Sequence, residues 1–148
     1  MKPEAGLSHL RKGRHSKNGQ IYHCIFSTLN RQPIFKQFDS ARGFISLLRE
    51  DENRGLSKTY AFVVMPDHIH WLFQLEQGDL SVTIKRIKSL YSKQSKSKVW
   101  NKGFYDHGIR AHEDLISTAR YIVANPLRAG LVDKIGDYPH WDSIFFEG

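Results

Sequence analysis

The sequence has little cysteine, no long apolar run, and one long segment without any acidic residue. Cys24 is the single cysteine, so an internal disulfide and a metal cluster built only from thiolates are both excluded. It lies within the apolar run 21–26, where we expect a small buried side chain. No apolar run approaches the ~20 residues that cross a membrane, so no membrane partner is predicted.

The amino-terminal residues lack the apolar stretch of a secretory signal, which favours a cytoplasmic location. The 148 residues suffice for one domain with a single sizeable core. A hydrophobic content of 40% and a charged content of 25% are ordinary for a soluble globular protein. We therefore predict a polar, basic arm over residues 1–20 and one domain over residues 21–148.

Positive charge is in excess and is unevenly placed. The formal net charge is +7, and no acidic residue occurs between Asp79 and Asp106. A lysine-rich helix face is by default only solvated, but this lack of compensating acids favours a surface for nucleic-acid phosphates. The cationic residues predicted to make such contacts are Arg11, Lys12, Arg14, Lys85, Arg86, Lys88, Lys93 and Arg110.

The pattern of apolar residues predicts the element order β-α-β-β-α-β-α. The predicted strands are 21–29, 58–65, 68–75 and a short one within 100–110, and the predicted helices are 39–53, 80–98 and 113–125. The first six elements follow the ferredoxin-like split βαβ pattern. We therefore expect an α+β fold whose four-stranded antiparallel sheet carries two helices on one face. The added C-terminal helix is then free to lie near the other face, and residues 127–148 form a closing tail.

His68 and His70 are separated by one residue in the third predicted strand. Side chains alternate along a strand, so the two imidazoles share a face while Ile69 points into the opposite layer. Two polar rings make a poor core because each would need a partner when buried. They are suited to holding a divalent cation over the sheet, although a His-x-His pair alone is a weak signal.

The third predicted helix directs two polar groups away from its apolar stripe. At about 100° per residue, Tyr121 falls opposite that stripe, and Asn125 lies one turn further on the same side. A phenol can attack phosphorus, but it is largely protonated at neutral pH and needs a metal nearby. His68 and His70 could hold that metal, with Asn125 as a third ligand through oxygen. Such a donor set suits Mg²⁺ or Mn²⁺ and leaves Zn²⁺ open.

These motifs, 65–70, 100–110 and 121–132, resemble those of the single-tyrosine HUH transposases. The resemblance covers about residues 20–145 and is closest to the REP-associated tyrosine transposase branch of the insertion-sequence family. It implies a ferredoxin-like fold, a divalent metal, single-stranded hairpin DNA as the partner, and a nucleoid-associated location for the protein. Tyr121 matches the nucleophile, His68 and His70 match the metal pair, and Asn125 stands where insertion-sequence relatives carry glutamine. Relatives include monomers and homodimers, so the resemblance leaves the oligomeric state open.

The resemblance implies a metal-dependent strand transferase that works through a 5′-phosphotyrosine. One alternative is a non-catalytic module that binds single-stranded nucleic acid on its sheet. Another is a metallohydrolase that uses water, for which Tyr121 would be dispensable. Two other tyrosines compete for the role of nucleophile: Tyr91 lies on an apolar helix stripe, and Tyr105 lies in a loop-like segment where it could stack on a base.

Overall fold

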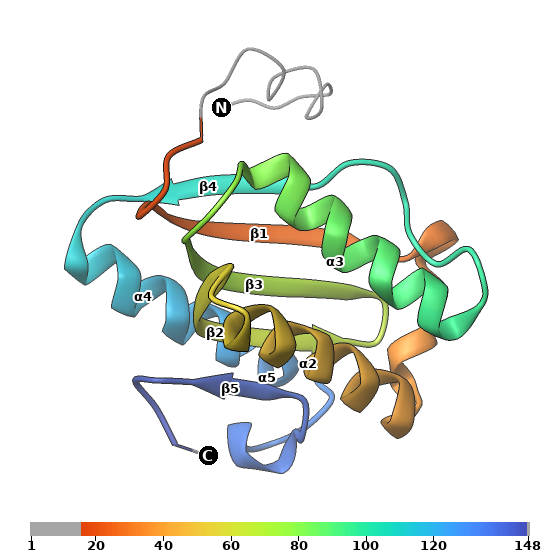
Figure 1. Ribbon diagram of the computed structural model, residues 1–148. Coiled ribbons are helices and arrows are strands. Elements are labelled where there is room, and N and C mark those ends of the chain that lie inside the picture. The colour runs from red at the N-terminus through yellow and green to blue at the C-terminus, as the bar shows by residue number, and fades with distance from the viewer. Residues whose placement is uncertain (1–15, 148) are drawn as a thin grey trace.

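The structure is a computed structural model that describes residues 16–147 (Figure 1). The predicted phosphate-contacting residues Arg11, Lys12 and Arg14 lie outside the described residues. The described chain forms one antiparallel sheet with the strand order β4-β1-β3-β2-β5. The strands are β1 (Ile21–Ser27), β2 (Ser57–Met65), β3 (His68–Leu75), β4 (Tyr105–Ile109) and β5 (Trp141–Ser143). The helices are α2 (Phe38–Asn53), α3 (Leu80–Ser95), α4 (His112–Val123) and α5 (Asn125–Arg128).

The hairpin formed by β2 and β3 lies at the centre of the sheet, and β1 pairs with the other side of β3. Met65 pairs with His68 across a tight turn made by Pro66 and Asp67. Proline presets φ and aspartate tolerates turn geometry, so this dipeptide reverses the chain immediately before His68. The histidine pair therefore begins at the first residue of a central strand.

One face of the sheet is covered by α2 and α3, the side from which Figure 1 is viewed. Asp79 caps α3 by accepting a 2.8 Å hydrogen bond from the backbone N–H of Val82. The predicted apolar stripe of this helix is buried, and so are two aromatic residues that follow it. These residues are Leu80, Ile84, Ile87, Tyr91, Trp100 and Phe104. Tyr91 is therefore a core residue, as its place on the stripe predicts.

The other face of the sheet packs against α4. Leu115, Ala119 and Ile122 of this helix contact a second apolar cluster that includes Val63 and Leu72. The alternation of β3 decides which side chains reach each layer: Ile69 is buried under α2 and α3, whereas Leu72 is buried under α4. His68 and His70 have the parity of Leu72 and so lie on the α4 face.

Several predicted element ends are wrong. The helix predicted over 113–125 breaks after Val123, and Asn125 instead begins α5. Pro126 does not end the helical region; it sits in the first turn of α5, where its missing N–H is not needed. The strand predicted to run to residue 29 ends at Ser27, and the chain turns into a 3₁₀ helix, Leu29–Arg31, in which Asn30 takes a φ of 55°.

Two further helix ends differ from the prediction. The helix expected to run to residue 98 ends at Ser95, where Lys96 takes a left-handed φ of 58°. The helix expected to start at Asp39 or Ser40 begins at Phe38, so Asp39 lies in its first turn rather than at its cap. An acidic residue in the first turn is still favourable next to the helix dipole.

The C-terminal tail is more than a closing segment, because β5 adds a fifth strand beside β2. The Tyr138 hydroxyl donates a 2.6 Å hydrogen bond to the Val64 carbonyl, and the His140 carbonyl accepts one from the Val64 N–H. The four-stranded ferredoxin-like sheet is thus confirmed, with an extra strand at its β2 edge. No helix within residues 16–147 has the length and apolar character needed to span a membrane.

Candidate active site

Four histidines form a row across three strands on the α4 face. His68 and His70 come from β3, His23 from β1, and His107 from β4, where it is paired in register with His23. The ring centroids of His68 and His70 are 5.1 Å apart, and those of His70 and His23 are 5.2 Å apart. The i, i+2 spacing in β3 thus brings the two predicted metal-binding rings together.

His70 is the most enclosed member of the row, with 4% of its surface exposed. Its Nδ1 lies 2.9 Å from Nε2 of His23, which is also buried. Burial lowers the pKa of His70 to about 2, and the nearby His23, His68 and Arg128 act in the same direction. Burial, together with His107, lowers the pKa of His23 to about 4. Both rings are therefore neutral at pH 7, which is the form that binds metals.

His68 is held by a chain of charged groups at the hairpin turn. Its Nδ1 lies 2.8 Å from Oδ1 of Asp67, and Oδ2 of Asp67 accepts a 3.0 Å hydrogen bond from Nε of Arg31. Burial by itself would raise the pKa of Asp67, but the hydrogen bonds from His68 and Arg31 outweigh it and lower that pKa. A carboxylate on Nδ1 leaves Nε2 of His68 available, a common arrangement around metal-binding histidines.

Tyr121 lies beside these rings without entering the core. Its side chain is 52% exposed, and its ring centroid is 6.2 Å from that of His70. The Arg128 guanidinium lies 3.9 Å from the centre of the Tyr121 ring, and its Nη2 donates a 2.8 Å hydrogen bond to the Tyr121 carbonyl. The phenol is therefore held near the histidine pair while it stays accessible to solvent.

Asn125 follows the break between the two helices, as the first residue of α5. Its Nδ2 is buried and has no hydrogen-bond partner among residues 16–147. An amide N–H is a donor, so a hydrogen-bond acceptor and not a cation would complete it, and Asn125 could bind a metal only through its oxygen. Within the described residues, no three His, Cys, Asp or Glu side chains are grouped to hold a metal ion. Two imidazole nitrogens and one amide oxygen are nevertheless a donor set that fits Mg²⁺ or Mn²⁺ with positions left open.

A groove of ≈ 570 Å³ opens next to Tyr121 on this face of the molecule. It runs between β1, β4 and α4 and is lined by His23, Ile25, Tyr105, His107, Ser117, Thr118 and Tyr121. Tyr105 is 38% exposed at the edge strand of the sheet. Imidazole, hydroxyl and aromatic groups together can contact both the phosphates and the bases of a single strand.

The predicted phosphate-contacting residues of the domain are of two kinds. Lys85, Lys93 and Arg110 are exposed. Arg86 instead donates a 2.8 Å hydrogen bond to buried Asp51, and Lys88 donates to the carbonyls of residues 101 and 103. A groove of ≈ 860 Å³ lies between α3 and the segment 98–104, and its wall includes Lys85, Lys88, Lys98 and Lys102.

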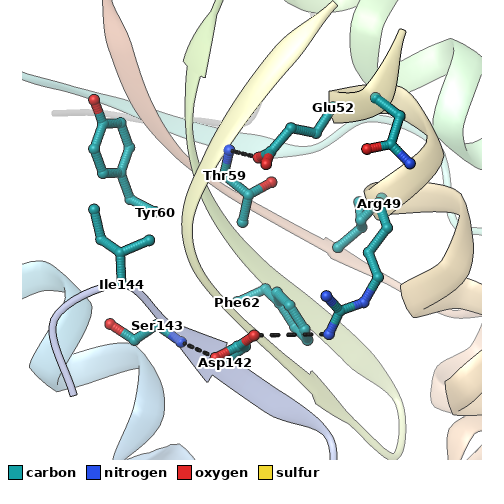
Figure 2. Close-up of a pocket in the computed structure, with 10 residues that line it drawn as sticks. Arg49, Glu52, Thr59, Tyr60, Phe62, Asp142, Ser143 and Ile144 are labelled. Carbon is teal, nitrogen blue, oxygen red and sulfur yellow. Dashed lines mark hydrogen bonds and ion pairs between the residues drawn. The ribbon is translucent and has the colours of Figure 1, made fainter. Parts of the chain in front are cut away.

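A smaller pocket of ≈ 350 Å³ lies elsewhere, between α2, β2 and β5 (Figure 2). Its charged side chains already have protein partners. Arg49 pairs with Asp142 at 3.6 Å, and Glu52 accepts a 2.6 Å hydrogen bond from the Thr59 N–H. Since these charged groups already have protein partners and no histidine lines the pocket, it is a poor candidate for the chemistry predicted from the sequence.

The sequence reasoning missed three residues that support the site: His23, Asp67 and Arg128. His23 shares one face of β1 with apolar Ile21 and Ile25, and its pairing with Leu72 of β3 puts that face on the side of the histidine pair. The position of His23 in the alternation of β1 can be read from the sequence, but only the register between β1 and β3 shows which face of the sheet it corresponds to. Arg128 comes two turns after Tyr121, and its contact depends on the break between α4 and α5.

Comparisons with known proteins identify the family of the chain. The family model described as "Transposase IS200 like" matches residues 16–125, which include the histidine pair, Tyr121 and Asn125. A REP-associated tyrosine transposase of Escherichia coli K12 is 33% identical over 82 residues, which are 53% of this chain and 50% of that protein. A Haemophilus influenzae protein with the provisional name REP-associated tyrosine transposase is 30% identical over 100 residues, 56% of this chain and 57% of that protein. The chain thus spans about half the length of these curated relatives.

Solved structures give the same answer for the fold. A REP-associated tyrosine transposase bound to a REP hairpin superposes with a TM-score of 0.73 and 25% identity, covering 86% of this chain and 79% of that chain. A Deinococcus radiodurans protein described as a transposase has a TM-score of 0.55 at 21% identity, covering 74% of this chain and 93% of that chain, and supports the fold alone. The resemblance found in the sequence is confirmed, and the protein belongs to the IS200-like transposase family.

Proposed function

We propose that this protein cleaves and rejoins single-stranded DNA next to a hairpin, using Tyr121 as the nucleophile. The observation that carries the proposal is the position of Tyr121: an exposed phenol whose ring lies 6.2 Å from a buried, neutral His70. The REP hairpin bound to the structural neighbour supports hairpin DNA as the substrate class. The whole transposition reaction of the longer relatives is part of the same proposal.

In the proposed reaction, the Tyr121 oxygen attacks a DNA phosphorus atom and the bond from phosphorus to the 3′ oxygen breaks. The phenol loses its proton, the departing 3′ oxygen gains one, and the new bond is a 5′-phosphotyrosine. Attack by a second 3′ hydroxyl reverses these changes and regenerates the phenol. Because the phosphodiester energy stays in the covalent link, rejoining needs no nucleotide cofactor.

His68, His70 and Asn125 are the residues proposed to hold a divalent metal, Mg²⁺ or Mn²⁺. When bound, the metal supplies a positive charge that polarises the phosphate and stabilises the charge that develops during attack. Asp67 and His23 hold the two histidine rings, and Arg128 holds the Tyr121 ring. These residues orient the reacting groups, which is a main source of rate in phosphoryl transfer.

The exposed cations are proposed to bind the DNA backbone. Lys85 and Lys93 lie on the sheet face opposite the histidines, whereas Arg110 directly follows the edge strand β4. The sheet edge formed by β4, where Tyr105 is exposed, is the proposed path for a strand that reaches both Tyr121 and the α3 lysines. Arg11, Lys12 and Arg14 of the arm remain predicted contacts, as do Arg86 and Lys88, although the latter two already have protein partners.

One assay separates this proposal from its alternatives. The protein is incubated with labelled single-stranded hairpin DNA and Mn²⁺, and the products are run on a denaturing gel. A covalent protein–DNA band that is lost with EDTA and in Tyr121→Phe supports the proposal. Free fragments that persist in Tyr121→Phe indicate a hydrolase that uses water, and binding without cleavage indicates a non-catalytic module.

A further inference from the structure

The hydrogen bond between His23 and His70 has a direction that matters for the site. His23 Nε2 and His70 Nδ1 are 2.9 Å apart, and the two residues are only 8% and 4% exposed. A hydrogen bond between two imidazole nitrogens needs a proton on one and a lone pair on the other. The direction of the hydrogen bond decides whether the other ring nitrogen of each histidine carries a proton.

Only one of the two directions leaves His70 able to bind a metal through Nε2. If His70 Nδ1–H donates to His23, then Nε2 of His70 keeps its lone pair. If His23 Nε2–H donates instead, the neutral His70 ring carries its proton on Nε2 and cannot act as a ligand there. His68 shows which state the site is built for, because the carboxylate of Asp67 at its Nδ1 can only accept a hydrogen bond.

We propose that His23 is a positioning residue that accepts a hydrogen bond from His70 Nδ1–H and so keeps Nε2 of His70 free for the divalent metal. The inference rests on the proposed function, since it takes the metal site as given. Metal-binding histidines usually donate their other N–H to a carboxylate or a carbonyl. Here Asp67 has that role for His68, and the His23 imidazole from a different strand has it for His70.

The first test reads the tautomer directly and needs neither metal nor DNA. Histidine ring nitrogens of the ¹⁵N-labelled, metal-free protein are correlated with the ring C–H protons by long-range NMR at pH 7, and His70→Gln assigns the His70 signals. The expected spectrum shows His70 protonated on Nδ1 and His23 unprotonated on Nε2. A His70 ring protonated on Nε2 overturns the inference, whatever the variants do.

The second test measures Mn²⁺ binding by the electron paramagnetic resonance signal of the free ion. His23→Leu leaves the His70 Nδ1–H without an acceptor, so its Mn²⁺ affinity should fall by roughly 10–100-fold. His23→Gln should retain most of the affinity, because its amide oxygen can accept the same hydrogen bond. His112→Gln removes an exposed histidine at the start of α4 and serves as the matched control, with wild-type affinity.

Unchanged affinity in His23→Leu, or equal losses in His23→Leu and His23→Gln, would overturn the role of His23. His70→Ala separates this failure from failure of the proposed function. If His70→Ala binds Mn²⁺ with wild-type affinity, His70 is not a metal ligand, and both the proposed metal site and the inference are wrong. A large loss in His70→Ala with none in His23→Leu overturns only the inference.

Discussion

At the scale of single residues, the site depends on side chains that hold other side chains. Asp67 fixes His68, His23 contacts His70, and Arg128 lies on the ring of Tyr121. The planar guanidinium contacts the phenol face at 3.9 Å and also donates to the Tyr121 carbonyl, so it restrains both the ring and the end of α4. A positive charge so close to the proposed nucleophile also suits the negative charge that develops there.

Replacing Arg128 therefore tests how Tyr121 is held. We expect Arg128→Ala to lower the rate of hairpin cleavage by about tenfold, equivalent to ~1.4 kcal/mol of transition-state stabilisation. Arg128→Lys keeps the charge but lacks the planar stacking surface, so its cleavage rate should lie between those of the wild type and Arg128→Ala. Single-turnover cleavage is the measurement, with circular dichroism as a check of folding. An unchanged rate in Arg128→Ala would show that Tyr121 needs no such support.

At the scale of elements, the C-terminal tail holds the end of β2, close to the hairpin turn that leads to the histidines of β3. Tyr138 and the backbone of His140 both bond to Val64, one residue before the end of β2. The His140 ring is buried between Phe38 and Tyr138, with centroid distances of 5.2 and 5.5 Å, and its Nδ1 has no partner among the described residues. The tail is therefore attached through a neutral, enclosed histidine.

This attachment predicts a pH dependence of stability. Burial lowers the pKa of His140, and Arg42 acts in the same direction. The unfolded chain, with an ordinary histidine pKa of about 6.5, takes up the proton first as the pH falls. The contribution of His140 to stability is therefore complete above pH ~6.5 and is lost as the pH falls toward its folded pKa. His140→Leu should show a shallower fall in the free energy of unfolding between pH 7 and pH 5.

Urea unfolding at a series of pH values measures this effect. Taking the difference between His140→Leu and wild type cancels the titration of every other group. Parallel pH profiles in the two proteins would mean that His140 titrates alike in the folded and unfolded states.

Local patterns predicted the elements better than their ends. The alternation in β3 located His68 and His70, and the helical angle of Tyr121 placed it outside the apolar stripe. The break at Ala124 was missed because a proline signals either the end of a helix or the first turn of the next one. The strand β5 was missed because three residues carry no periodic signal, and β2 and the tail are far apart in sequence. His23 was missed because its partner depends on strand register.

At the scale of the whole molecule, the α3 lysines and the proposed catalytic residues lie on opposite faces of one sheet. The histidine row and Tyr121 lie on the α4 side, while a lysine-lined groove lies along α3. A single strand could connect the two faces only around an edge, and β4 is the edge strand next to both grooves. The net charge of +7 by itself would attract any polyanion, so the placement of charge needs its own test.

Charge reversal on α3 provides that test. Lys85→Glu and Lys93→Glu should each weaken hairpin DNA binding and reduce the salt dependence of the affinity by about one unit of slope in log K against log salt. Lys134→Glu changes the net charge equally, but it lies in the tail before the turn 135–137. Binding titrations at several salt concentrations compare the three variants. Equal losses in all three would assign the effect to net charge alone.

The most direct measurement is to identify the amino acid that becomes joined to DNA. The wild-type protein is incubated with single-stranded hairpin DNA and Mn²⁺, the covalent complex is digested with protease and nuclease, and the modified peptide is sequenced by mass spectrometry. The structure predicts one adduct, a 5′-nucleotide on the hydroxyl of Tyr121. An adduct on Tyr105, or strand cleavage that persists in Tyr121→Phe, would contradict the assignment of Tyr121 as the nucleophile.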